Sequence, residues 1–148
     1  VLRHAPQMRR LFVGEGIETV LSVWWALSQT GRLTPADGFW SSVDLGNLGG
    51  RAIGRVEHPT ARIVDSKGRS RPLLVPDAAP DLDSKAIVVP EGVEEVFLLG
   101  DGDSDRFATE LTLLRAARRT SLTCSTVKAV RLAWADDGAD FNDMLEAA

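Results

Sequence analysis

One short stretch of the sequence, Glu95-Val-Phe-Leu-Leu-Gly100, restricts the possible folds most strongly. Its apolar residues follow one another instead of alternating with polar ones, which is typical of a strand buried on both faces of a parallel sheet. Because parallel strands cannot be joined by tight hairpins, they need long crossover connections, usually helices. The stretch therefore predicts a chain in which strands alternate with helices.

The patterns in the rest of the chain agree with this prediction. Strands are expected over residues 10–13, 39–45 and 127–134, and helices over 17–30, over 104–119 and in the closing sequence DFNDMLEAA. The helix over 104–119 is expected to have one apolar face, made of Phe107, Leu111, Leu114 and Ala117. The predicted fold class is α/β, with a mostly parallel four-stranded sheet flanked by helices.

Residues 51–85 are interpreted as an insertion within a single domain that spans residues 1–148. Glycines at positions 46, 49, 50 and 54 are expected to interrupt regular structure at its start. The sequence DSKGRSRP lies between two apolar stretches and predicts the turn of a β-hairpin, whereas PDAAPDLDS predicts a loop. A chain of 148 residues is long enough for one ordinary core. Because it begins with Val1 instead of methionine, we expect it to be a piece of a larger protein.

Composition excludes several kinds of protein. A net charge of −4 argues against a protein that binds nucleic acid nonspecifically over much of its surface. The only cysteine, Cys124, leaves no internal disulfide, and His4 and His58 are too isolated for a zinc site. No apolar run approaches the roughly 18 residues of a membrane span. We therefore expect a cytoplasmic setting and no membrane partner.

Carboxylates follow three of the predicted strands. Glu15 follows the first strand, Asp101 and Asp103 follow the strand that ends at Gly100, and Asp140 and Asp143 follow the last. In open α/β sheets, ligands bind beyond the carboxyl ends of the strands, so these acids should meet at one edge. Crowded carboxylates repel one another unless a cation compensates them, and oxygen ligands suit Mg²⁺, with Mn²⁺ as a substitute. The sequence thus predicts a magnesium site there.

Each acidic motif also has a simpler interpretation. Asp140 could be a helix N-cap with Asp143 at the third helical position, and Glu18 fits ordinary compensation of a helix dipole. The series Asp101-x-Asp103-x-Asp105 begins like a calcium-binding loop, but that motif requires glycine at its sixth position and glutamate at its twelfth, and the chain has neither. GEGIET differs from a dinucleotide fingerprint because its third glycine is missing.

Taken together, the strand followed by GEGIET, the apolar strand ending in GDGD and the closing DFND resemble a Toprim domain. The resemblance covers residues 10–31 and 94–145, and is nearest to the variety in primase-like replication proteins of phages, plasmids and other mobile elements. It implies a Rossmann-like fold in which Glu15, Asp101 and Asp103 are catalytic and also bind Mg²⁺. Asp140 and Asp143 match the downstream acidic motif of primases.

The resemblance implies nucleotidyl transfer on DNA or RNA, with nucleotides as substrates, in a bacterial or phage-infected cell. It also implies other domains of the parent protein, such as a zinc-binding or helicase domain. A metal-dependent nuclease and a non-catalytic nucleic-acid binding module remain as alternatives. Two positions depart from the family pattern, since primases commonly have an acid at Thr19 and many relatives have glycine at Arg106. The chain contains no tyrosine and so has no topoisomerase nucleophile.

Basic residues supply the candidates for nucleic-acid contacts. Lys67, Arg69 and Arg71 lie at the predicted hairpin turn, and Arg106 begins the helix that follows the acidic loop. The predicted turn could equally be a solvated tip. Arg115, Arg118 and Arg119 form a second candidate cluster, although basic residues also compensate a helix carboxyl end.

Overall fold

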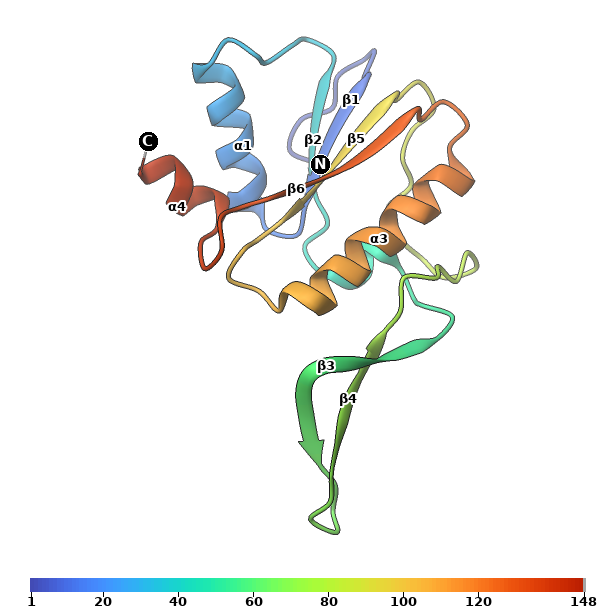
Figure 1. Ribbon diagram of the computed structural model, residues 1–148. Coiled ribbons are helices and arrows are strands. Elements are labelled where there is room, and N and C mark those ends of the chain that lie inside the picture. Colours follow the sequence, from blue (N-terminus) through green and yellow to red (C-terminus); the bar gives the residue numbers. More distant parts are fainter. Residues whose placement is uncertain (148) are drawn as a thin grey trace.

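The computed structural model describes residues 1–147 and contains a four-stranded sheet with strand order β2-β1-β5-β6 (Figure 1). Every neighbouring pair of strands in this sheet is parallel. The predicted α/β class and mostly parallel sheet are confirmed. The four strands are β1 (Arg10–Gly14), β2 (Asp37–Ser41), β5 (Glu95–Gly100) and β6 (Ala129–Trp134).

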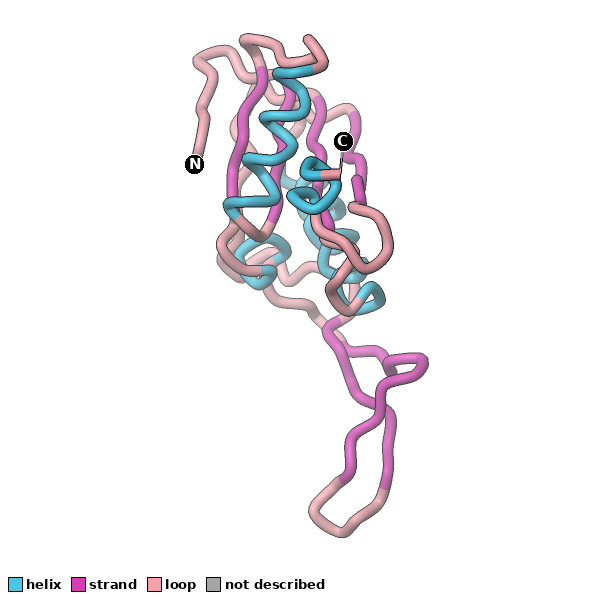
Figure 2. The backbone as a smooth tube through the Cα atoms, turned by 90° about the vertical axis from the view of Figure 1, so that its left-hand side faces the viewer, coloured by secondary structure: helices cyan, strands magenta, loops and turns pink. Residues whose placement is uncertain are grey.

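Helices cover both faces of the sheet. Helices α1 (Ile17–Gln29) and α4 (Phe141–Glu146) pack against each other on one face, in front of the sheet in Figure 2. Helix α3 (Arg106–Thr123) lies on the opposite face and contacts the short helix α2 (Leu45–Gly49). Within residues 1–147, no helix combines the length and the apolar character needed to cross a bilayer.

Strand β5 explains why the sheet has two cores. Val96 and Leu98 pack into one buried cluster together with Leu113 of α3. Phe97 and Leu99 belong to the cluster on the other face, which includes Val20 of α1, also fully buried. Consecutive residues of a strand point to opposite faces, so a continuous apolar run serves both cores. This confirms the prediction made from the same run.

The second strand was predicted over 39–45, and this range is wrong. Strand β2 begins at Asp37, whose side chain is fully buried and paired with Arg10 at 2.7 Å. Burial raises the pKa of Asp37, but hydrogen bonds from Arg10 and Thr34 outweigh it and hold the pKa below its usual value. Such a satisfied carboxylate can begin a buried strand, although an unpaired one could not.

Helix α2 occupies residues that were expected to be irregular. The Asp44 side chain caps this helix by accepting a hydrogen bond from the Asn47 N–H at 2.7 Å. Packing against α3 adds tertiary support, and together these outweigh the low helix propensity of the glycines at 46 and 49. The cap also ends the chain reversal that follows β2.

Helix α3 differs from its prediction in both its limits and its buried face. It begins at Arg106, after Asp105 caps it through the Ala108 N–H, and it ends at Thr123. The residues expected to form its apolar face are only partly buried. The helix packs against the sheet on one side and against the insertion on another. It therefore buries polar residues beside Leu113 and Ala116, namely Thr109, Thr112, Arg115, Arg119 and Thr120.

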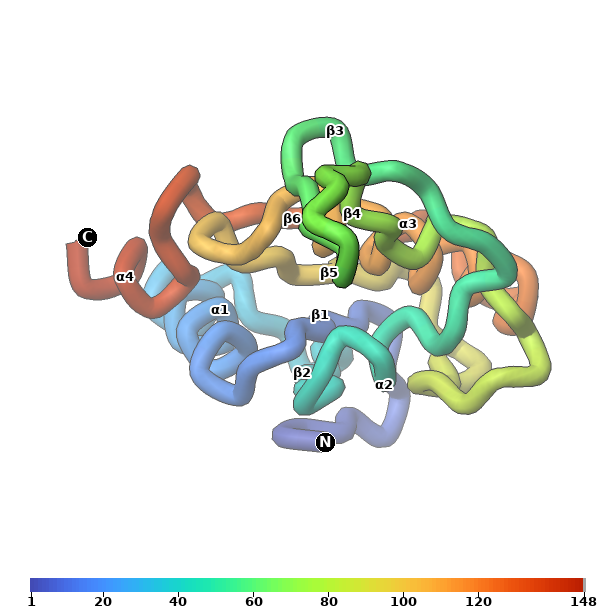
Figure 3. The backbone as a smooth tube through the Cα atoms, turned by 90° about the horizontal axis from the view of Figure 1, so that it is seen from below, coloured from blue at the N-terminus to red at the C-terminus, as the bar shows by residue number. Residues whose placement is uncertain are grey.

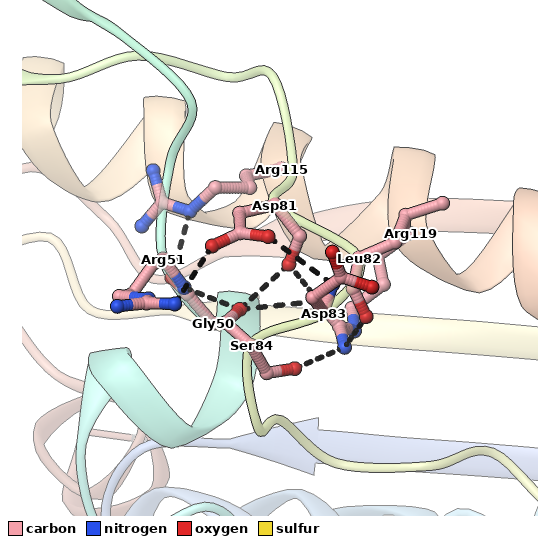
Figure 4. A network of polar contacts seen from close by, with 8 residues as sticks. All are labelled: Gly50, Arg51, Asp81, Leu82, Asp83, Ser84, Arg115 and Arg119. Carbon is pink, nitrogen blue, oxygen red and sulfur yellow. Dashed lines mark hydrogen bonds and ion pairs between the residues drawn. The ribbon is translucent and has the colours of Figure 1, made fainter.

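Two arginines of α3 hold the insertion loop in place (Figure 4). Arg115 donates to the carbonyls of Gly50 and Asp77, and Arg119 donates to the carbonyls of Asp81, Leu82 and Ser84. Their exposed fractions are 4% and 9%. The prediction that these two bind nucleic acid is therefore wrong, because their guanidinium groups are buried and already satisfied. Arg118 likewise donates to the carbonyl of Ala78.

The predicted β-hairpin is confirmed. Strand β3 (Arg55–Val64) pairs with β4 (Ser70–Pro76) in antiparallel orientation, with an irregularity between Glu57 and Arg62. We call residues 55–76 the arm. The arm extends away from the sheet and its helices, below them in Figure 1 and Figure 2.

Candidate acidic site at the carboxyl edge of the sheet

Glu15 stands in the tight connection between β1 and α1. A Cβ at Gly14 would lie 3.1 Å from Val20 Cγ2 and 3.2 Å from Thr19 Cγ2, so the helix begins very close to the strand and a larger residue would push these side chains away. The Glu15 carbonyl accepts hydrogen bonds from Ser41 Oγ at 2.6 Å and from the Val43 N–H at 3.0 Å. The end of β2 therefore fixes the backbone from which the Glu15 carboxylate projects.

Val43 adopts a left-handed backbone conformation, with φ of 71°. A β-branched residue rarely does so, and such a conformation costs about 1–3 kcal/mol. The Val43 N–H is held between Ser41 Oγ, at 3.1 Å, and the Glu15 carbonyl. The side chain itself is 74% exposed, so packing does not explain the strain. The hydrogen bonds to the Glu15 turn keep Val43 in this conformation.

Asp101 meets the first turn of α1. Thr19 Oγ1 lies 3.1 Å from Asp101 Oδ1 and 3.4 Å from Oδ2, and donates to this carboxylate. The Thr19 side chain is buried, with only 5% exposed. The carboxyl end of β5 is thus joined to the beginning of α1 by a side-chain hydrogen bond between two predicted motifs.

Gly102 brings the acidic loop against the loop that follows β6. Its N–H donates to the Ala139 carbonyl at 2.8 Å, and its carbonyl accepts from the Gly138 N–H at 3.0 Å. A Cβ at Gly102 would lie 1.9 Å from the Asp136 carbonyl oxygen, which no side chain could tolerate. This close contact aligns the Asp101 loop with the loop that ends at Asp140.

Asp140 and Asp143 form the predicted capping box of α4. The Asp140 carboxylate accepts from the Asp143 N–H at 2.7 Å, and the Asp143 carboxylate accepts from the Asp140 N–H at 3.1 Å. The capping interpretation is confirmed. It leaves each carboxylate with further lone pairs, since an ionised carboxylate accepts about four hydrogen bonds.

The acids influence one another electrostatically. Burial raises the pKa of Glu15, and the negative charges of Asp101 and Asp44 raise it further. Burial also raises the pKa of Asp101; the Thr19 hydrogen bond lowers it, the charges of Asp103 and Asp140 raise it, and the net shift is upward. Carboxylates from the ends of four strands therefore share one electrostatic field.

An open hollow of about 340 Å³ lies at this edge, lined by Glu15, Gly16, Ile17, Glu18, Thr19, Ser41, Val43 and Asp140. A larger hollow of about 550 Å³ lies between α1 and α4, but no acidic or basic side chain lines it. Glu15 and Asp140 thus share the smaller hollow, where the chain reversals after β1 and β2 meet; Asp101 does not line it but is hydrogen-bonded to Thr19, which does.

The donor set suits a magnesium ion in one respect. Its ligands would all be carboxylate oxygens, and the raised pKa values of Glu15 and Asp101 come first from burial and then from neighbouring negative charge, which a cation would offset. Among residues 1–147, however, no three His, Cys, Asp or Glu side chains are arranged as a ready metal cage. Mg²⁺ is commonly held by one or two carboxylates while water and substrate phosphates complete its shell, so Asp101 with Asp103 fits this mode.

The predicted nucleic-acid contacts lie in two places. Lys67, Arg69 and Arg71 are on the arm, where Arg69 pairs with Asp65 at 2.9 Å. Arg106 stands at the start of α3, with its guanidinium carbon 3.6 Å from the centre of the Trp134 ring. It also lies 3.7 Å from a carboxylate oxygen of Asp137. Only Arg106 directly follows the acidic loop.

Two residues of the site were not predicted. Asp44 follows β2 as the other acids follow their strands, so the same rule would have found it had the strand been assigned its true end at Ser41. Thr19 was regarded only as a departure from an acidic position, whereas its hydroxyl binds Asp101. No sequence signal indicates that contact, because a threonine on the first turn of a helix is unremarkable.

Comparisons with protein-family models, with curated proteins and with solved structures found no match to this chain. The function is therefore inferred from the residues and their geometry.

Proposed function

We propose that the chain is a Toprim-like catalytic domain that performs metal-dependent nucleotidyl transfer on nucleic acid, as part of a primase-like replication protein. The observation that carries this proposal is the meeting of acids at one sheet edge, where burial, and then the charges of neighbouring acids, raise the pKa values of Glu15 and Asp101. Acids gathered without an ion pair are costly to a fold, and such groups often mark functional sites.

The roles differ between the acids. Glu15 projects from a turn whose backbone is fixed by Ser41 and Val43, and its raised pKa suits a group that takes a proton from a sugar hydroxyl. Asp101, oriented by Thr19, and Asp103 would hold Mg²⁺. When bound, Mg²⁺ would supply positive charge that offsets the charge of a phosphate. Arg106 would contact phosphate oxygens beside the acidic loop.

The direct test is turnover of labelled single-stranded DNA with nucleotides and with Mg²⁺ or Mn²⁺, for the wild type and Glu15→Gln. Extension of the labelled strand supports nucleotidyl transfer, and shortening of the strand supports the nuclease alternative instead. We expect Glu15→Gln to lower turnover about 100- to 10,000-fold, because it loses the basic oxygen, with partial recovery at high metal concentration.

The matched control is Glu110→Gln, which makes the same change at an exposed position of α3. It should keep wild-type turnover. Full turnover in a folded Glu15→Gln protein would overturn the catalytic role of this site and favour the binding-module alternative.

A further inference from the structure

We propose that the arm is a binding element for duplex nucleic acid, which it holds on the side of the molecule where the acids lie. The inference rests on the proposed function and names the form of nucleic acid that the site would receive. It concerns residues 55–76 as a whole, beyond the three basic residues at the turn.

The arm points from the same end of the sheet as the acids. In Figure 1 the parallel strands end toward the bottom, where the arm begins, and in Figure 3 the arm lies nearest the viewer over that edge. His58 of β3 contacts Asp105, which caps α3 and closes the acidic loop, with Nε2 3.1 Å from Oδ2. The base of the arm is therefore attached to the segment that carries Asp101 and Asp103.

The hydrogen bonds of His58 fix which of its ring nitrogens donates to Asp105. Its Nδ1 accepts from the Thr60 N–H at 3.2 Å and from the Ala61 N–H at 2.8 Å. Because Nδ1 is an acceptor, Nε2 carries the proton and donates to Asp105. The ring is 8% exposed and meets Phe107 edge to face. The irregular part of β3 is thus fixed to the beginning of α3.

The arm has a charge opposite to that of the rest of the chain. It contains five of the 17 lysines and arginines and only two of the 21 acidic residues, Glu57 and Asp65. Positive charges that gather on one hairpin repel one another and do not stabilise the fold. A positively charged element on an acidic chain therefore indicates a polyanionic partner. It would also hold the phosphate backbone where the acids alone would repel it.

Not all five charges are free to bind. Asp65 pairs with Arg69, and Arg62 donates to Ser70 Oγ at 2.9 Å. The side chains of Lys67 and Arg71 are exposed and form no ion pair or hydrogen bond within the described part of the chain. Arg71 lies opposite Ile63, so one face of the arm presents a cation beside an apolar side chain.

The shape of the arm favours a duplex over a single strand. Two paired strands lie about 4.8 Å apart, and a two-stranded ribbon fits the major groove of B-DNA, which is about 12 Å wide. Proteins that hold single strands usually stack bases on aromatic side chains, but residues 55–76 contain no Phe, Trp or Tyr. The exposed Val64 and Leu74 would meet sugars or thymine methyl groups.

Binding of a fluorescent duplex, and of one of its strands alone, tests the inference when measured by anisotropy in EDTA over a range of salt concentrations. The test variant is Lys67→Ala with Arg71→Ala. The matched control is Arg32→Ala with Lys85→Ala, which removes two exposed charges outside the arm. At low salt we expect the arm variant to bind duplex about tenfold more weakly, with its salt slope reduced by about 0.9 for each lost phosphate contact, while the control matches the wild type.

Equal loss in the arm variant and the control would overturn the inference, as would unchanged duplex binding in the arm variant or preferred binding of the single strand. Absence of any nucleic-acid binding by the wild type would point to a protein partner and would also overturn it. Glu15→Gln removes one repelling carboxylate and should bind duplex in EDTA at least as tightly as the wild type. The two proposals can therefore fail independently. The proposal for the arm is tested by duplex binding, and the proposed function of the acidic site is tested by turnover.

Discussion

Thr19 donates a hydrogen bond to Asp101 over 3.1 Å, although the two residues are 82 positions apart in the chain. The contact joins the first turn of α1 to the carboxyl end of β5. It also opposes the effect of burial and of the neighbouring acids on the pKa of Asp101, because a donor stabilises the ionised form. Thr19 thus favours the charged form of the carboxylate that would bind a cation.

Replacement of Thr19 by valine tests this role. Valine has nearly the same shape but no hydroxyl, so Asp101 should lose both its orientation and part of its tendency to ionise. We expect metal affinity and turnover to fall about 10- to 100-fold. Thr19→Ser retains the hydroxyl and should restore most of both quantities, as measured by titration calorimetry with Mn²⁺ and by the turnover assay. Equal losses in the valine and serine variants would contradict this role, because serine keeps the hydroxyl.

The raised pKa of Glu15 predicts a specific dependence of stability on pH. Burial and the charges of Asp101 and Asp44 raise its pKa in the folded protein above the ordinary value. The protonated form therefore contributes stability that is complete below the ordinary pKa and is lost as pH rises through the folded pKa. Without metal, Glu15→Gln should therefore be more stable than the wild type at pH 7, by about 0.5–1 kcal/mol, and equally stable near pH 4. Denaturant unfolding at both pH values measures the difference.

Asp37 provides a control of opposite sign for that experiment. Its pKa is lowered in the folded state, so its contribution is present above the unfolded value and disappears as pH falls through the folded one. Asp37→Asn should cost about 3 kcal/mol at pH 7, because Arg10 loses its partner, and less as the solution becomes acidic. A stabilising effect of Glu15→Gln that is the same at both pH values would contradict the electrostatic cause.

Gly102 should not tolerate a side chain. A methyl group there would collide with the Asp136 carbonyl, and both loops would have to move apart. We expect Gly102→Ala to cost about 3 kcal/mol of stability and to lower turnover about 100-fold through displacement of the acids. Gly68→Ala is the control, because Gly68 has a positive φ but nothing within 4 Å, and should cost only about 1 kcal/mol with no change in turnover.

The strain at Val43 should be measurable. Glycine adopts φ of 71° without steric cost, so Val43→Gly should raise stability by about 0.5–1 kcal/mol after the entropy of the unfolded glycine is included. Val43→Ala retains a Cβ and should gain less. If strain at Val43 helps to hold the Glu15 turn, the glycine variant should also lose part of its turnover. A glycine variant less stable than the wild type would show that the Val43 side chain contributes more than its exposure suggests.

The sheet could be predicted from sequence because its signals are local. The run at 95–100 is apolar on both faces, and the sequence around Glu15 marks a strand that turns into a helix. The start of β2 could not be predicted, since Asp37 is tolerated there because of hydrogen bonds from Thr34 and from Arg10, which is 27 positions away. The buried face of α3 was missed for a similar reason, because Arg115 and Arg119 look like surface residues until their carbonyl partners are known.

The acidic site could be predicted in outline but not in detail. The rule that ligands gather at the carboxyl ends of parallel strands brings Glu15, Asp101 and Asp140 to one edge. It says nothing of side-chain orientation. The role of Thr19 and the conformation of Val43 both depend on hydrogen bonds between distant segments, which no pattern along the chain indicates.

The first and last paired residues of the arm, Arg55 and Pro76, lie opposite each other in the ribbon. The chain therefore leaves the domain and returns to it at nearly the same point. Beyond the contact between His58 and Asp105, the arm can lengthen or shorten without any change in the order of β2, β1, β5 and β6. Changes in the length of this hairpin are therefore uncoupled from the sheet, and evolution can vary the reach of the arm while the strand ends that carry the acids keep their places.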